Sequence, residues 1–82
     1  MRELFMGKKQ ALETPVEYYL LAEDRDTLGE SYGIRIICGE EKESVRDITM
    51  SQNKILALLD RVMTGVVTPI TLRDVVEDWL LC

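Results

Sequence analysis

The hydrophobic period of this chain changes halfway along its length. Up to about Ile48 the apolar residues occur in short extended runs, whereas from Ile55 to Leu80 they recur at i, i+3, i+4 and i+7. A period of two residues is typical of strands, and a period of 3.6 residues is typical of helices. The pattern therefore predicts a small α+β domain in which strands come first and helices follow.

Three strands are expected in the first half of the chain. The first covers residues 16–23 and the second covers residues 32–39, and the polar stretch 24–31 between them predicts an antiparallel hairpin with a long loop. A third strand is expected at residues 43–48 after a turn at residues 39–42, because this segment is short and mixed in polarity, as edge strands are. The sequence thus predicts a small three-stranded antiparallel sheet.

Residues 1–14 form an N-terminal segment that is harder to interpret, while residues 15–82 are expected to form a single α+β domain. The run Leu4-Phe5-Met6 can add a further strand or pack back on the sheet, but the polar residues after it are typical of a loose segment. The segment is therefore either an extra strand or disordered.

Two helices are expected in the second half, both packed on one face of the sheet. The first begins at Ser51, whose hydroxyl can accept a backbone N–H of the first turn, and Gly65 is expected to end it as a left-handed cap. The second is expected to begin near Thr71. The buried residues are predicted to be Ile55, Leu58, Leu59 and Val62 in the first helix, and Leu72, Val75, Val76, Trp79 and Leu80 in the second.

The composition is that of a small cytoplasmic protein. The 82 residues are 46% hydrophobic and 30% charged with a net charge of −5, and the longest apolar run, residues 18–22, is too short to cross a bilayer. No secretory signal or lipidation motif is visible at either end. We expect no membrane association.

Residues that carry chemistry are scarce. The chain has no histidine, and its two cysteines are far apart, with Cys38 expected as a reduced core thiol and Cys82 without a functional role. Residues 24–29 begin like a calcium loop, but Leu28 and Arg35 stand where oxygen ligands belong. Carboxylates are plentiful without a paired nucleophile. We therefore expect no catalytic residue, no cofactor and no metal, and hence no enzyme.

The helix pair, with its short Gly-containing turn, is also compatible with a helix-turn-helix. However, the second helix sets Arg73 against Asp74, Glu77 and Asp78, and an acidic chain supplies few phosphate contacts. We therefore expect no nucleic-acid binding. A nucleic-acid or transcription-associated factor that uses this helix pair is the alternative function. A small-ligand binder or minor enzyme is a further alternative.

Four segments of the chain carry a resemblance to a known family. They are, in order, Tyr18-Tyr19-Leu20-Leu21, Tyr32-Gly33-Ile34-Arg35-Ile36, Val45-Arg46-Asp47-Ile48-Thr49 and Val67-Thr68-Pro69-Ile70-Thr71-Leu72-Arg73-Asp74-Val75-Val76-Glu77-Asp78-Trp79-Leu80. Through them, residues 16–81 resemble a family of short, uncharacterised bacterial proteins, mostly from anaerobic Gram-positive bacteria. The resemblance implies a domain of unknown function with no assigned catalytic or binding residues.

Alternation in the first two strands places apolar side chains on both faces of the sheet. One set contains Tyr18, Leu20, Tyr32, Ile34 and Ile36, and the other contains Tyr19, Leu21 and Ile37. One helix pair covers one face only, so the second set is expected to form the centre of a symmetric homodimer interface of about 800 Å² per partner. An unidentified protein partner is the other occupant, and residues 1–14 covering this face would instead give a monomer. The expected function is a small non-enzymatic interaction or regulatory module.

Overall fold

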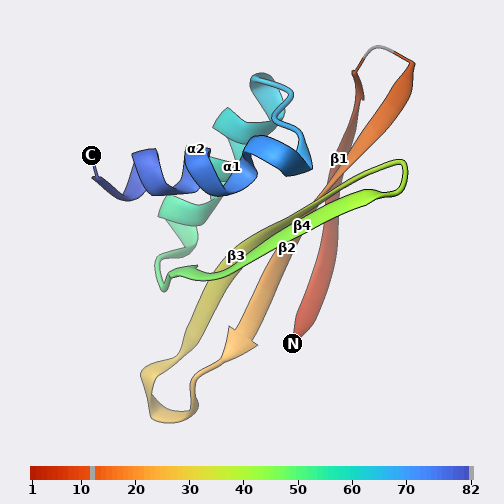
Figure 1. Ribbon diagram of the computed structural model, residues 1–82. Helices are drawn as coiled ribbons and strands as arrows, with labels where there is room; N and C mark the ends of the chain where they lie inside the picture. The colour runs from red at the N-terminus through yellow and green to blue at the C-terminus, as the bar shows by residue number, and fades with distance from the viewer. Residues whose placement is uncertain (12, 82) are drawn as a thin grey trace.

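The computed structural model describes residues 1–11 and 13–81, so Cys82 lies outside the described residues. The chain forms one antiparallel sheet with strand order β1-β2-β3-β4, followed by two helices on one of its faces (Figure 1). The elements are β1 (Arg2–Ala11), β2 (Thr14–Asp24), a short 3₁₀ helix (Asp26–Leu28), β3 (Glu30–Cys38), β4 (Glu41–Thr49), α1 (Gln52–Thr64) and α2 (Pro69–Leu81). The predicted α+β class with an antiparallel sheet is confirmed, but the prediction of three strands is wrong because the sheet has four.

The additional strand is β1, which lies within the segment 1–14 and pairs with β2 along its whole length. Leu4 pairs with Leu20 and Gly7 pairs with Tyr18, so the register shifts by one residue between Phe5 and Gly7. The extra residue is Met6, which forms a β-bulge. The run Leu4-Phe5-Met6 does not alternate between apolar and polar residues, but the bulge lets it form part of a strand.

The central hairpin of β2 and β3 follows the predicted alternation. Tyr18 pairs with Ile36, and Leu20 pairs with Ile34, on the face that the helices cover. Tyr19 pairs with Arg35, and therefore lies on the opposite face. The two predicted sets of apolar residues on β2 and β3 are thus separated by the sheet.

The fourth strand begins earlier than expected because the turn before it is tighter. Cys38 pairs with Glu41, so only two residues, Gly39 and Glu40, form the loop instead of the predicted four. Gly39 has a φ of 63°, and a positive φ at the first loop residue is the geometry that two-residue hairpin loops require. Further along β4 the register shifts near Asp47, which has a φ of 56°.

Helix α1 begins as predicted and ends differently. The Ser51 side chain accepts the backbone N–H of Lys54 at 3.3 Å, as an N-cap does. The predicted left-handed cap at Gly65 is wrong, because Gly65 has a φ of −82° and the left-handed residue is Val66, at 49°. The N–H of Val66 bonds to the carbonyl of Met63 at 3.1 Å, and Val67 bonds to that of Val62 at 3.0 Å, which is a Schellman motif shifted by one residue.

Helix α2 begins two residues before the predicted start. Pro69 is its first residue, a position where the missing N–H of proline costs no helical hydrogen bond. Leu72 and Val76 are buried as expected, but Trp79 is only partly buried and Leu80 is 56% exposed. The sequence therefore predicted too many buried residues in this helix.

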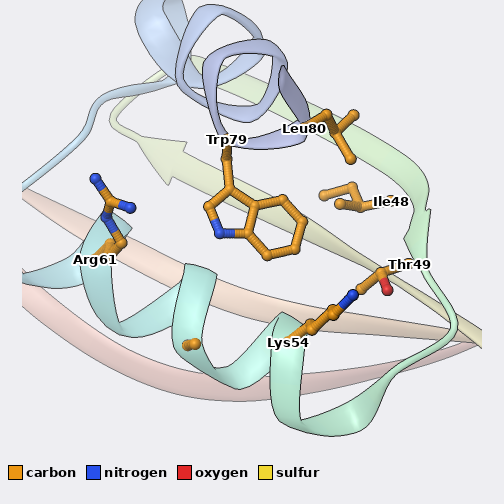
Figure 2. Close-up of a pocket in the computed structure, with 7 residues that line it drawn as sticks. Ile48, Thr49, Lys54, Arg61, Trp79 and Leu80 are labelled. Carbon is orange, nitrogen blue, oxygen red and sulfur yellow. The ribbon is translucent and has the colours of Figure 1, made fainter. Parts of the chain in front are cut away.

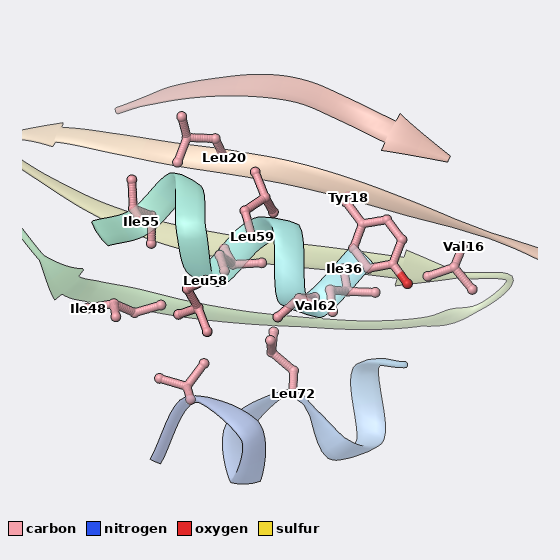
Figure 3. Close-up of a cluster of buried hydrophobic side chains, with 12 residues drawn as sticks. Val16, Tyr18, Leu20, Ile36, Ile48, Ile55, Leu58, Leu59, Val62 and Leu72 are labelled. Atoms are coloured by element: carbon pink, nitrogen blue, oxygen red, sulfur yellow. The ribbon is translucent and has the colours of Figure 1, made fainter. Parts of the chain in front are cut away.

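The core lies between α1 and the middle of the sheet, with α2 alongside β4 (Figure 3). It includes all four predicted residues of α1, Ile55, Leu58, Leu59 and Val62. Tyr18 is fully buried in this cluster, and its hydroxyl donates a 2.9 Å hydrogen bond to the carbonyl oxygen of Val67, in the turn between the helices. The central strand is thereby tied to the helix pair by a polar bond as well as by packing.

Replacing Tyr18 with Phe is expected to lower the free energy of unfolding by about 1–2 kcal/mol, because the Val67 carbonyl loses its partner while the ring packing is kept. Urea unfolding of the two proteins measures the difference. A change below about 0.5 kcal/mol would show that water replaces the hydroxyl at this carbonyl without cost.

The same variant has a second readout in alkaline solution. Burial, with a smaller contribution from Cys38, raises the pKa of Tyr18 above its ordinary value of 10.0. The folded protein therefore holds this proton more tightly than the unfolded chain, and the resulting stability is present below pH 10 and lost as the pH rises through the folded pKa. Tyr18→Phe lacks this titration, so its stability should fall less steeply above pH 10.

Replacing Gly33 with Ala is expected to lower the free energy of unfolding by about 1–3 kcal/mol. A Cβ at this position would overlap the Val45 carbonyl oxygen and lie 2.9 Å from the Cα of Arg46, and backbone of a neighbouring strand cannot yield as a side chain can. Gly65→Ala is the matched control, since the nearest atom there is 3.3 Å away and φ is −82°. Equal effects of the two substitutions in thermal unfolding would contradict the close approach of β3 and β4.

Candidate functional sites: the helix-free face, the β1 edge and the interhelical groove

The three residues predicted as an interface centre lie on the helix-free face of the sheet, but they differ in accessibility. Tyr19 and Ile37 are partly exposed, whereas Leu21 is only 1% exposed within the single chain. The ring of Phe5, from β1, meets the ring of Tyr19 edge-on, with 5.5 Å between centroids. Tyr19 and Phe5 therefore form an accessible aromatic pair, while Leu21 is already covered.

Leu21 is covered by ion pairs that cross the strands of this face. Arg35 of β3 reaches Glu3 of β1 at 2.8 Å and so passes over β2 beside Leu21. Arg46 of β4 binds Glu23 of β2 through two hydrogen bonds of 2.6 and 2.7 Å, a bidentate pair. The bonds to Arg46 hold the pKa of Glu23 below its usual range. The aliphatic parts of such long side chains can shield an apolar residue from water.

A further arginine closes the end of the helix-free face. Arg25 donates to the Ser31 hydroxyl at 3.1 Å, and its guanidinium lies 3.0 Å from a carboxylate oxygen of Asp47. Ser31 is 1% exposed, so this bond satisfies a buried hydroxyl. The helix-free face is therefore largely polar, in contrast to the apolar surface that the alternation predicted.

Within the sheet, the exposed large apolar side chains lie on the edge strand β1, while the others are Met1 and, on the helical half of the chain, Met50, Leu56, Ile70, Leu80 and Leu81. Leu4, Phe5 and Met6 of β1 are 44%, 56% and 37% exposed. Sequence reasoning placed them in an uncertain segment, although three consecutive apolar residues beside strand-compatible ones were the available signal. We call this strand, Arg2–Ala11, with its exposed side chains the β1 edge.

The two edges of the sheet are not equivalent. The β4 edge is accompanied by α2, carries the distorted backbone at Asp47, and has an Arg73–Glu43 ion pair at 3.6 Å. Such distortions and charges are devices that keep another strand from pairing. The β1 edge has the Met6 bulge, but no helix lies along it, as Figure 1 shows.

A groove lies where α1, α2 and the end of β4 meet (Figure 2). Its volume is about 420 Å³, and its lining residues are Ile48, Thr49, Lys54, Ala57, Arg61, Trp79 and Leu80. The indole of Trp79 lies between Lys54 on one side and Arg61 on the other. We call this hollow the interhelical groove.

A second, smaller hollow lies on the other side of the indole. It has a volume of about 260 Å³ and shares Arg61 and Trp79 with the groove, while Leu58, Val75 and Asp78 complete its lining. Trp79 therefore forms a wall between two hollows, which explains why it packs against the core without being buried in it.

Other residues with chemical potential are dispersed. Cys38 is a free, partly buried thiol packed against the core, in line with its predicted place. Within residues 1–11 and 13–81, the cysteine and carboxylate side chains form no cluster of three that could hold a metal ion. Neither described helix combines the length and the apolar character needed to cross a membrane.

The model of a family of unknown function (DUF6514) matches the chain over residues 2–81. The chain belongs to this family. The resemblance to a domain of unknown function is thereby confirmed, and the match to DUF6514 also takes in β1, which the segment-based resemblance left out. No curated protein and no solved structure matches the chain.

For this DUF6514 chain, Trp79→Ala is expected to cost about 1–3 kcal/mol, less than the loss of a fully buried tryptophan. The reason is that hollows on both sides of the ring leave part of its surface without packing partners. Chemical denaturation followed by circular dichroism measures the cost, because the substitution removes the only tryptophan. A loss above about 4 kcal/mol would show a core residue instead.

Proposed function

We propose that this protein is a small non-enzymatic interaction module that self-associates through its β1 edge. The observation that supports the proposal is the coincidence of an uncovered edge strand with the exposed side chains Leu4, Phe5 and Met6. An open edge presents backbone N–H and carbonyl groups that a second strand can pair with. Apolar side chains along the same strand add the surface that a stable contact needs.

A two-fold arrangement suits the charges of this edge. One end of β1 carries Arg2 and Glu3, which pair with Glu30 and Arg35 of β3, and the other end carries Lys8 and Lys9. Antiparallel pairing of two copies places the lysines of each strand next to this neutralised end of its partner and away from the partner's own lysines. A two-fold contact needs only one self-complementary surface, and it joins the two four-stranded sheets into a continuous one.

The aromatic pair extends this contact onto the helix-free face. Phe5 and Tyr19 form an accessible island next to the β1 edge, whereas the cross-strand ion pairs keep the rest of the face polar. Tyr19 thus keeps its proposed place in the interface, with Phe5 and Met6 beside it, while Leu21 supports the site from below. Ile37 lies two strands away from β1, near the margin.

Light scattering at tens of micromolar tests self-association. The proposal predicts a mass near twice 9.4 kDa, and a shift toward 9.4 kDa for Phe5→Glu, because a charge would be buried without a partner at the centre of the contact. Ile70→Glu is the matched control, since Ile70 is an exposed apolar residue away from the edge, and it should leave the mass unchanged.

Hydrogen exchange distinguishes edge pairing from unspecific association. The amides of β1 that point away from β2 should exchange more slowly at high than at low protein concentration, because pairing protects them. A mass of 9.4 kDa for the parent protein, or equal effects of Phe5→Glu and Ile70→Glu, would contradict the proposal.

A further inference from the structure

We propose that the interhelical groove binds a small organic anion that has an aromatic or branched apolar body and a single carboxylate or comparable acidic group. This binding site is independent of the β1 edge, from which it is separated by α1 and the covered face of the sheet. The proposal therefore stands or falls separately from self-association.

The charges of the groove identify the ligand as an anion. Lys54 and Arg61 are the charged residues among its lining, and no acidic side chain lines it in the described part of the chain. Neither cation forms an ion pair with a described carboxylate. By contrast, the other five arginines, at positions 2, 25, 35, 46 and 73, pair with acidic residues of the sheet. Two cations that form no ion pair with the described carboxylates thus line one hollow of a protein with a net charge of −5.

Thr49 adds a directed hydrogen-bond donor beside Lys54. Its hydroxyl oxygen accepts the backbone N–H of Ser51 at 3.1 Å, so its own proton is free to point elsewhere. Figure 2 shows the Lys54 side chain extended from α1 toward Thr49. A carboxylate at this end of the groove can receive bonds from an ammonium and a hydroxyl together.

The remaining walls are apolar and supply the contact for the ligand's body. The indole of Trp79 forms one wall, and Ile48 and Leu80 lie across from it. Ala57 also lines the groove, and its short side chain leaves space there. A volume of about 420 Å³ falls within the range of small-molecule sites, of about 300–1,000 Å³. An aromatic wall next to a polar end fits a flat or branched body, with the anionic group directed toward Lys54.

Arg61 lies on the side of the indole that faces away from Lys54. It lies seven residues after Lys54 on α1, which corresponds to roughly 10 Å along the helix axis. It also lines the smaller hollow, where Asp78 reduces the local positive charge. The ligand's acidic group therefore binds at the Lys54 end, and Arg61 contributes attraction over a longer distance.

The single tryptophan of the chain makes the test direct, because its fluorescence reports on the groove itself. Phenylacetate is the probe, phenylacetamide is its neutral counterpart of the same shape, and 2-phenylethylamine is the cationic counterpart. Phenylacetate should change Trp79 fluorescence with saturation at a Kd of about 1 mM or tighter, as expected for a small ligand of this size. Phenylacetamide should bind at least about 10-fold more weakly, and the amine should not saturate.

Variants locate the binding within the groove. Lys54→Gln should weaken phenylacetate binding about 5- to 10-fold and Arg61→Gln about 2- to 3-fold, because an ion pair at a partly exposed site is screened by water. Arg73→Gln is the control, because Arg73 lies on α2 outside the groove, facing Glu43, and it should leave the Kd unchanged. Amide chemical shifts should move at Thr49, Lys54 and Ala57 in the parent protein.

Any of the following results would overturn the assignment. The first is an absence of saturation by phenylacetate up to about 10 mM. The second is equal binding of phenylacetate and phenylacetamide, which would reveal an unspecific apolar contact. The third is an equal loss of affinity in Lys54→Gln and Arg73→Gln, or shifts confined to another surface, which would place the anion elsewhere. Unfolding curves of each variant confirm that a loss of binding is not a loss of fold.

Discussion

The arrangement of both helices depends on the hydrogen bond between the Tyr18 hydroxyl and the Val67 carbonyl. Tyr18 stands on β2 in the interior of the sheet, and Val67 lies in the turn that joins α1 to α2. A turn has few regular backbone partners, so a buried side-chain donor at this point fixes where the second helix starts. The contact therefore links the strand half of the chain to the direction in which α2 runs.

The same turn contains the most strained backbone of the helical half. Val66 has a φ of 49°, a conformation that is costly for a β-branched residue, and glycine stands immediately before it at a position that needs no such freedom. The Schellman bonds and the Tyr18 hydroxyl hold the turn in this shape. Because α2 leaves the turn from a fixed point, Trp79 is placed ten residues along α2 from Pro69, opposite Lys54 and Arg61.

The periodicity of the sequence correctly predicted those structural features that depend on residues close together in the chain. The N-cap at Ser51, the four buried positions of α1 and the two faces of the central hairpin are all set by residues within a few positions of each other, and all are confirmed. The fourth strand was not predictable in this way, because the Met6 bulge matters only when β2 lies beside it. The sequence placed Leu21 on the correct face, but it did not predict that an ion pair covers this residue. The two partners of that ion pair, Glu3 and Arg35, are 32 residues apart in the sequence.

The site residues show the same division between local and distant information. The groove joins Thr49 and Lys54 to Trp79, and no spacing along the sequence announces that these residues meet. Composition nevertheless held a signal in hindsight: on α1, Lys54 and Arg61 are two turns apart, on the side of the helix that borders the buried stripe.

The distribution of ion pairs separates the surfaces of the protein by role. On the helix-free face, the arginines are paired across strands with carboxylates, and the consequence is a covered Leu21 and a polar surface. In the groove, Lys54 and Arg61 have no such partners among the described residues, and on the β1 edge the apolar side chains of Leu4, Phe5 and Met6 are exposed. The arginines of the sheet are thus neutralised, whereas Lys54 and Arg61 line a hollow with an aromatic wall and form no ion pair with the described carboxylates.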